Sequence, residues 1–284
     1  MEENYQIILL HITNKCNLSC DFCYMNSFVN KQTPSIDNIV KYVRRYTELN
    51  NNTKYEVVFH GGEPMTLGIN FISELILKLK SFISKFGIQT NMSLMGDDWI
   101  ELFKREKVRV GSSYNDSGRE NFIDDADTLV YMIMKTTTEE DIDDFFESLP
   151  ISIKRVNFET YKPVSKKDFD SNAPDAEYLI KIYQYIRENY SNRNIILRPF
   201  DVPRWLCYDA SCGKNYGTCI TFEGKTYGCN YIASAFPQLY IYDLEKDKFG
   251  PAAKIFSLSH MGCPIRAIVT KSKIDPYREV YERI

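Results

Sequence analysis

The eight cysteines of this 284-residue chain fall into two groups. Cys16, Cys20 and Cys23 lie close together near the start, whereas the other five lie between Cys207 and Cys263. In a reducing compartment, grouped thiols more often bind a metal or an iron–sulfur cluster than form disulfides. The two groups therefore predict two metal sites.

The first group has the spacing Cys-x3-Cys-x2-Cys and directly follows a short apolar run at residues 7–12. Three thiolates on one loop can hold three corners of a cubane [4Fe–4S] cluster and leave its fourth iron open. A structural zinc site normally has a fourth protein ligand and paired x2 spacings. Zinc with His11 as the fourth ligand, or three unligated core thiols, are the alternatives for this loop.

The segment CNLSCDFCY at residues 16–24 resembles the radical S-adenosylmethionine (radical SAM) superfamily. The resemblance implies that the open iron binds the amino and carboxylate groups of SAM, with Tyr24 among the cofactor-binding residues. It implies that an electron from the cluster cleaves the sulfonium, and that the 5′-deoxyadenosyl radical takes a hydrogen atom from a substrate. The electron would come from an external donor of the flavodoxin or ferredoxin type.

The motif HGGEP at residues 60–64 follows the second predicted strand. Glycines allow a close backbone approach to a ligand, so Gly61 and Gly62 are candidate cofactor-binding residues. The motif resembles the GGE motif of the family, which implies that Glu63 holds the amino group of SAM. An ordinary turn with a solvated glutamate is the alternative.

Two weaker motifs follow the next strands. Thr90-Asn91 resembles the TN pair often found after the third strand, which makes Asn91 a cofactor-binding candidate. The fourth strand ends at Gly111-Ser112-Ser113, where the family places a serine that contacts ribose. Either Ser112 or Ser113 is the candidate, because the alternation of side chains depends on where the strand begins.

Four thiols of the second group, Cys212, Cys219, Cys229 and Cys263, suffice for all corners of a second, auxiliary [4Fe–4S] cluster without an open iron. Zinc is the alternative ligand of this set. Its spacing resembles the opening of a SPASM domain or of the shorter twitch domain, and the lack of a later cysteine run implies one auxiliary cluster. Cys207 is not needed by this four-ligand set. It could replace Cys212 as a ligand, be a buried thiol or act as a hydrogen-atom donor.

Strand and helix patterns alternate over the first two hundred residues. We expect strands at residues 7–12, 55–59, 88–95, 108–112, 129–134, 154–159 and 195–198. We expect helices after a Thr33 cap, at 71–83 closed by Gly87, at 97–103, from Thr138 to near Pro150, and from Asp175 to Tyr190. This alternation predicts an α/β fold with a parallel sheet, and the resemblance implies a partial (βα)6 barrel.

From Pro199 onward the pattern changes, and TFEGKTYGC predicts a β-hairpin that turns at Glu223-Gly224. We therefore expect a barrel domain at residues 1–200 and a small cysteine-rich twitch- or SPASM-like domain at 201–284, outside the barrel.

The charge balance argues against a protein that grips nucleic acid, because 35 Lys and Arg against 38 Asp and Glu leave a net charge of −3. No apolar run approaches the roughly 18 residues of a membrane span. The N-terminus lacks the basic start and apolar stretch of a signal peptide, so we expect a cytoplasmic protein.

The resemblance to the radical SAM superfamily, with a twitch- or SPASM-like C-terminal extension, implies an enzyme that crosslinks, oxidises or epimerises a peptide made on ribosomes. Asn230 stands where the sulfatase-maturing branch carries an aspartate, which argues against that specific reaction. The chain starts a few residues before its first strand, so we expect that a partner protein, or none, recognises a leader peptide. A radical SAM enzyme of small-molecule cofactor or metabolite biosynthesis, and a non-catalytic metal-stabilised module, are the alternatives.

Overall fold

The computed structural model describes residues 5–20, 23–27, 34–50, 54–114, 123–198, 218–229, 233, 238–251, 277, 280 and 283. The chain forms two compact units. The first unit comprises Met1–Gly111 and Ser211–Ser257, and the second comprises Ser112–Ala210 and Leu258–Ile284. The domain boundary expected near residue 200 stays a prediction.

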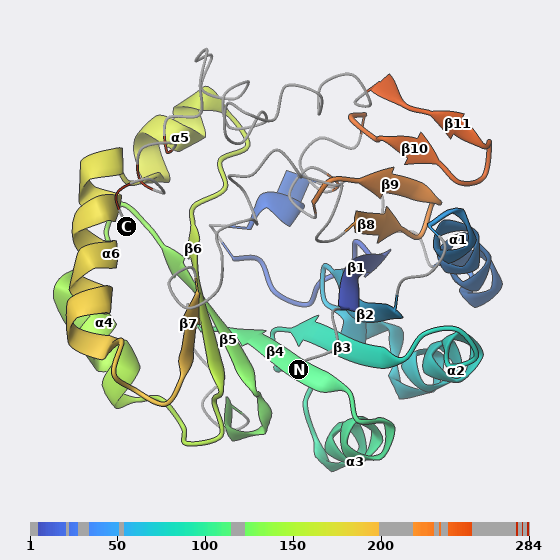
Figure 1. The fold of residues 1–284 in the computed structure, drawn as a ribbon, viewed down its shortest axis with the longest axis horizontal. Coiled ribbons are helices and arrows are strands. Elements are labelled where there is room, and N and C mark those ends of the chain that lie inside the picture. The colour runs from blue at the N-terminus through green and yellow to red at the C-terminus, as the bar shows by residue number, and fades with distance from the viewer. Residues whose placement is uncertain are drawn as a thin grey trace. The chain divides into compact units, whose positions relative to one another are not determined.

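The first unit contains parallel strands, the helices that cover them and a short antiparallel extension (Figure 1). Its strands are β1 (Tyr5–Thr13), β2 (Lys54–Gly61), β3 (Lys85–Thr90), β8 (Thr218–Thr221), β9 (Lys225–Tyr227), β10 (Tyr242–Asp243) and β11 (Lys248–Phe249), and β4 (Arg109–Ser113) runs across the unit boundary. Its helices are α1 (Ile36–Leu49), α2 (Ile69–Leu79) and α3 (Asp97–Glu106), with short 3₁₀ turns η1 (Tyr24–Ser27) and η2 (Pro64–Leu67).

The core of this unit lies around β1, which pairs in parallel with β2 on one side and with β8 on the other. Its side chains Ile8, Leu10 and Ile12 are completely buried. Helices α1 and α2 bury one apolar face each, as expected for helices that cover a parallel sheet. The ends of β1 and β2 therefore meet at one edge of a rigid sheet.

The predicted hairpin is confirmed, because β8 and β9 pair antiparallel and Gly224 takes a left-handed φ of +78° at the turn. Its expected place outside the barrel sheet is wrong. Strand β8 continues the parallel sheet beside β1, with Cys219 opposite Leu9, and β9, β10 and β11 extend it by antiparallel pairing.

The second unit contains the parallel strands β5 (Thr128–Ile133), β6 (Arg155–Thr160) and β7 (Ile196–Arg198). Its helices are α4 (Glu139–Glu147), α5 (Lys166–Asn172) and α6 (Ala176–Tyr190), with a 3₁₀ turn η3 (Ile123–Asp125). Thr138 caps α4 through a full capping box and Asp175 caps α6, so both predicted helix starts are confirmed.

Three local expectations are wrong. Helix α1 is capped by Ser35 rather than Thr33. Helix α2 ends at Leu79, and Gly87 lies inside β3, where it packs closely against Val58. The third strand ends at Thr90 rather than Met95. None of the helices in the described ranges is long and apolar enough to cross a membrane.

Candidate functional site

The cysteine loop begins three residues after the end of β1. Cys16 is exposed, and Cys20 and Cys23 are partly buried. The sulfur of Cys16 accepts a hydrogen bond from the Leu18 backbone N–H at 3.4 Å. Within the described residues no three Cys, His, Asp or Glu side chains are gathered closely enough to hold a metal ion. The three thiols thus share one short segment that follows β1.

Gly61 and Gly62 lie against the segment that leads into this loop. Gly62 N donates to Thr13 O at 2.8 Å, and Glu63 N donates to Lys15 O at 2.7 Å. A Cβ at Gly61 would lie 2.2 Å from Thr13 O, and a Cβ at Gly62 would lie 2.2 Å from Lys15 O. This close approach fixes where the cysteine loop starts, and the expected roles of Gly61 and Gly62 toward a cofactor stay predictions.

The Glu63 carboxylate is buried, with 1% of the residue exposed, and it connects the ends of β2 and β3. Its Oε1 accepts hydrogen bonds from Met65 N at 2.9 Å and from Thr90 Oγ1 at 2.8 Å. Its Oε2 accepts from Asn91 N at 2.6 Å. The alternative of a solvated turn glutamate is therefore wrong, because this side chain is held by three protein donors.

Asn91 is the second predicted residue that the structure brings to the cysteine loop. Its Nδ2 lies 3.8 Å from Cys16 Sγ and 3.0 Å from Asn17 Oδ1. Ser93 contacts both asparagines through its hydroxyl. The sequence reasoning missed Asn17 and Ser93. An Asn followed two residues later by Ser, just after a strand, is a turn pattern that would have drawn attention to Ser93.

The remaining predicted cofactor-binding residues are placed as follows. Tyr24 opens η1 and is partly buried. Ser112 and Ser113 end β4 in the second unit, and Ser112 is buried whereas Ser113 is partly exposed. Their roles toward a cofactor stay predictions.

In the second cysteine set, Cys219 is fully buried on β8. Burial, and secondarily the nearby Cys229, raise the pKa of the Cys219 thiol well above its usual value. Cys219 pairs with Tyr227 across the β8–β9 hairpin, and Cys229 follows two residues after this partner. Cys207, Cys212 and Cys263 lie outside the described residues, so their expected roles stay predictions.

His11, the zinc ligand considered for the first loop, lies inside β1 opposite His60 of β2. It is 1% exposed. Burial, and secondarily the neighbouring His60, lower the pKa of His11 to about 3. Its imidazole is therefore neutral at physiological pH and belongs to the strand core.

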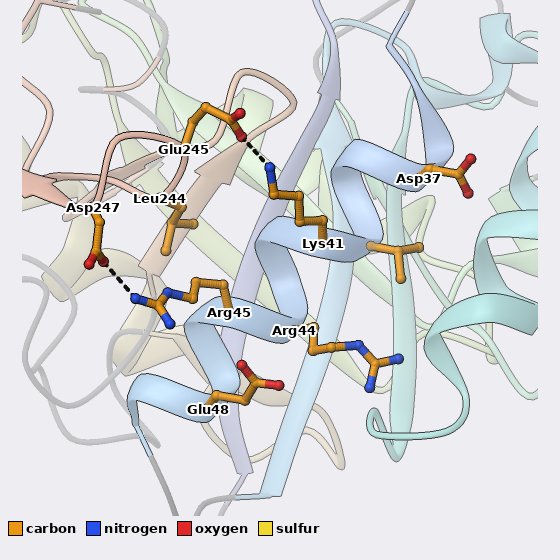
Figure 2. Close-up of a pocket in the computed structure, with 9 residues that line it drawn as sticks. Asp37, Lys41, Arg44, Arg45, Glu48, Leu244, Glu245 and Asp247 are labelled. Carbon is orange, nitrogen blue, oxygen red and sulfur yellow. Dashed lines mark hydrogen bonds and ion pairs between the residues drawn. The ribbon is translucent and has the colours of Figure 1, made fainter.

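A surface hollow over α1 is a poor candidate for the chemistry, because four of its charged side chains form two ion pairs with one another. Figure 2 shows Lys41 and Arg45 of α1 reaching toward Glu245 and Asp247, with N···O distances of 2.7 Å in both pairs. These ion pairs connect α1 to the turn between β10 and β11. The hollow therefore lies where α1 contacts the turn between β10 and β11 within the first unit.

Comparison with known proteins identifies relatives of this site. Residues 10–150 match the radical SAM superfamily. An uncharacterised protein of Methanocaldococcus jannaschii is 30% identical over 119 residues, which are 40% of this chain and 40% of that protein. The cysteine-type anaerobic sulfatase-maturating enzyme of Clostridium novyi is 28% identical over 125 residues, 39% of this chain and 32% of the enzyme. The matches thus span well under two thirds of these relatives.

Two solved structures share the fold over nearly the whole chain. Native anSMEcpe with bound AdoMet and Cp18Cys peptide superposes with a TM-score of 0.71 at 16% identity, covering 99% of this chain and 96% of that one. SuiB of Streptococcus suis bound to the precursor peptide SuiA gives 0.68 at 18% identity, covering 96% and 74%. Both confirm the predicted α/β fold, a partial barrel with a C-terminal hairpin.

Proposed function

This chain belongs to the radical SAM superfamily through residues 10–150, and we propose that it is a radical SAM enzyme that modifies a peptide. In this proposal Cys16, Cys20 and Cys23 hold the SAM-binding [4Fe–4S] cluster. The donor set fits, because three thiols lie on one loop, as three corners of a cubane cluster require. When bound, the cluster supplies the electron that cleaves SAM.

The observation that carries this proposal is the junction between the cysteine loop and the GGE motif. Two backbone hydrogen bonds hold the segment before Cys16 against Gly62 and Glu63, and the Glu63 carboxylate fixes the end of β3 beside them. Hydrogen bonds thus connect the predicted site residues that follow β1, β2 and β3 at one edge of the sheet. Such an edge, at the carboxyl ends of parallel strands, is where α/β enzymes bind ligands.

Glu63 has a positioning role, because its buried carboxylate holds the backbone of Asn91 and Met65. Its proposed contact with the amino group of SAM would add one more donor to a carboxylate that accepts hydrogen bonds from Met65, Thr90 and Asn91. Titration of SAM into the reconstituted enzyme tests this contact: Glu63→Gln should weaken binding while the cluster spectrum persists. Equal affinity in the variant and the wild type would leave Glu63 with its positioning role only.

The substrate class rests on the two peptide-bound neighbours, anSMEcpe and SuiB, whose folds this chain shares. We propose a ribosomally made peptide as the substrate and crosslinking, oxidation or epimerisation as the reaction. The proposed electron donor is a flavodoxin or ferredoxin. The proposed second [4Fe–4S] cluster is held by Cys212, Cys219, Cys229 and Cys263. Two of these residues, Cys219 and Cys229, lie on either side of the hairpin turn at Gly224.

Anaerobic purification and reconstitution test the proposal. The enzyme should release 5′-deoxyadenosine from SAM with dithionite, and a peptide encoded beside its gene should change mass. Release of 5′-deoxyadenosine by a small metabolite but by no peptide would favour the small-molecule alternative. A colourless protein with stoichiometric zinc and no SAM cleavage would show a metal-stabilised module.

Cys207 is proposed as a hydrogen-atom donor for epimerisation, since its thiol is not needed by a four-ligand auxiliary cluster. Reaction in deuterated water separates the outcomes. Epimerisation fixes one deuterium at an α-carbon, leaves no two-hydrogen loss and stalls in Cys207→Ala. A product lighter by two hydrogens, formed equally by that variant, would show crosslinking or oxidation.

A further inference from the structure

Three polar side chains beside the cysteine loop form a closed ring of hydrogen bonds. Asn91 Nδ2 donates to Asn17 Oδ1 at 3.0 Å, and Asn17 Nδ2 donates to Ser93 Oγ at 2.7 Å. Ser93 Oγ in turn donates to Asn91 Oδ1 at 2.6 Å. Each hydroxyl or amide is both a donor and an acceptor, an arrangement in which hydrogen bonds strengthen one another.

The ring settles which way the Asn91 amide faces. The backbone N–H of Ser93 also donates to Asn91 Oδ1, at 3.0 Å, and a backbone N–H can only donate. The oxygen therefore faces Ser93 and the NH₂ group faces the cysteine loop. Met92 makes this turn possible with a left-handed φ of +59°, which is uncommon for a residue other than glycine.

The second hydrogen of that NH₂ group is directed at the first cysteine. Asn91 Nδ2 lies 3.8 Å from Cys16 Sγ, which also accepts the Leu18 N–H at 3.4 Å. The backbone N–H of Asn91 is held independently, by the buried Glu63 carboxylate at 2.6 Å. Asn91 is thus anchored through its backbone by one partner and oriented through its side chain by two others.

We propose that Asn91 is an N–H donor to the Cys16 sulfur of the SAM-binding cluster, and that Asn17 and Ser93 are positioning residues that aim its amide. The inference rests on the proposed function, since it assigns Cys16 to that cluster. A donor to a cluster sulfur stabilises the extra negative charge of the reduced state and raises the reduction potential. The ring therefore makes the cluster easier to reduce.

The test is the midpoint potential of the reconstituted cluster, read by spectroscopic redox titration. Asn91→Leu keeps the size and the backbone N–H but loses the donor. We expect its ratio of reduced to oxidised cluster at a fixed potential to fall about tenfold, a shift of about 59 mV for one electron. Ser93→Ala should move the potential in the same direction by less, and Ser93→Thr should restore it.

A double variant distinguishes loss of the Asn91 orientation from an unspecific structural effect of the Ser93 substitution. Because Ser93 acts through Asn91, Asn91→Leu with Ser93→Ala should shift the potential no further than Asn91→Leu alone. The matched control is Ser81→Ala, whose exposed hydroxyl donates to the nearby Lys78 carbonyl, and it should leave the potential unchanged.

An unchanged potential in Asn91→Leu with a full cluster would overturn the inference. If Asn91→Leu takes up no cluster, Ser93→Ala decides instead, and an unchanged potential there is equally decisive. Failure of the proposed function looks different: the wild-type protein would fail to cleave SAM, or SAM cleavage would persist after Cys16 is replaced.

Discussion

Replacing Glu63 by glutamine should destabilise the folded protein even without SAM or a cluster. The Glu63 carboxylate accepts three hydrogen bonds, two on Oε1 from Met65 N and Thr90 Oγ1 and one on Oε2 from Asn91 N. A glutamine side chain has one acceptor oxygen. It can serve Met65 and Thr90, or it can serve Asn91, but its NH₂ group must then face a donor.

The magnitude follows from the number of bonds lost. In the better orientation the glutamine oxygen stays on Met65 and Thr90, and the Asn91 N–H loses a charged acceptor. A hydrogen bond to a charged group contributes about 1.5–3 kcal/mol, and water cannot replace it at a side chain that is 1% exposed. We therefore expect the free energy of unfolding to fall by about 2 kcal/mol, and by more in Glu63→Ala, which loses all three bonds.

Urea unfolding of the apo-protein, followed by circular dichroism, measures this change. The matched control is Glu74→Gln on α2, an exposed carboxylate paired with Lys78, which should change the free energy of unfolding by less than about 0.5 kcal/mol. A double-mutant cycle with Thr90→Val should show coupling to Glu63. An unchanged unfolding midpoint in Glu63→Gln would refute the claim that this carboxylate joins β2 to β3.

Three further outcomes follow from the geometry. In Gly62→Ala the new Cβ would lie 2.2 Å from Lys15 O, so the free energy of unfolding should fall by about 2 kcal/mol or more. The control Gly96→Ala places its Cβ in open space and should change the free energy of unfolding little, and equal losses in urea unfolding would contradict this prediction. The pKa of His11 lies near 3 in the folded protein and near 6.5 in the unfolded chain, so between these values the unfolded chain binds one more proton. The free energy of unfolding should therefore fall as the pH drops from about 6.5 toward 3, by up to about 1.4 kcal/mol per pH unit. An identical dependence of the free energy of unfolding on pH in His11→Gln would refute the assignment. Because burial raises the pKa of Cys219, its thiol should resist iodoacetamide at pH 8 in the folded apo-protein and react once urea unfolds it; rapid labelling of the folded form, located by mass spectrometry, would contradict its burial.

Local sequence signals predicted the elements whose start or turn is determined by residues within a few positions in the chain. The capping residues Thr138 and Asp175, and the left-handed turn at Gly224, act within a few residues, so their helices and hairpin could be located in advance. Helix α5 was missed because it has no buried residue and hence no apolar period. The role of Gly87 was predicted wrongly, because the sequence does not distinguish a glycine that packs against a neighbouring strand from one that ends a helix.

The site was predictable in its residue types but not in its contacts. The thiol spacing and the GGE motif identified which residues matter. That Glu63 is held by Thr90 and Asn91, and that Gly62 meets Lys15, depends on strand register between segments far apart in the chain. Side-chain periodicity within one strand carries no such information.

The most direct test of the central claim compares the wild-type protein with Cys16, Cys20 and Cys23 replaced together by alanine. Both proteins are reconstituted anaerobically with iron and sulfide, and iron content and 5′-deoxyadenosine release with dithionite and SAM are measured on the same samples. We predict about eight irons and release of 5′-deoxyadenosine in the wild type, and about four irons with no release in the variant. Cleavage of SAM by the triple variant would contradict the assignment of these thiols to the catalytic cluster.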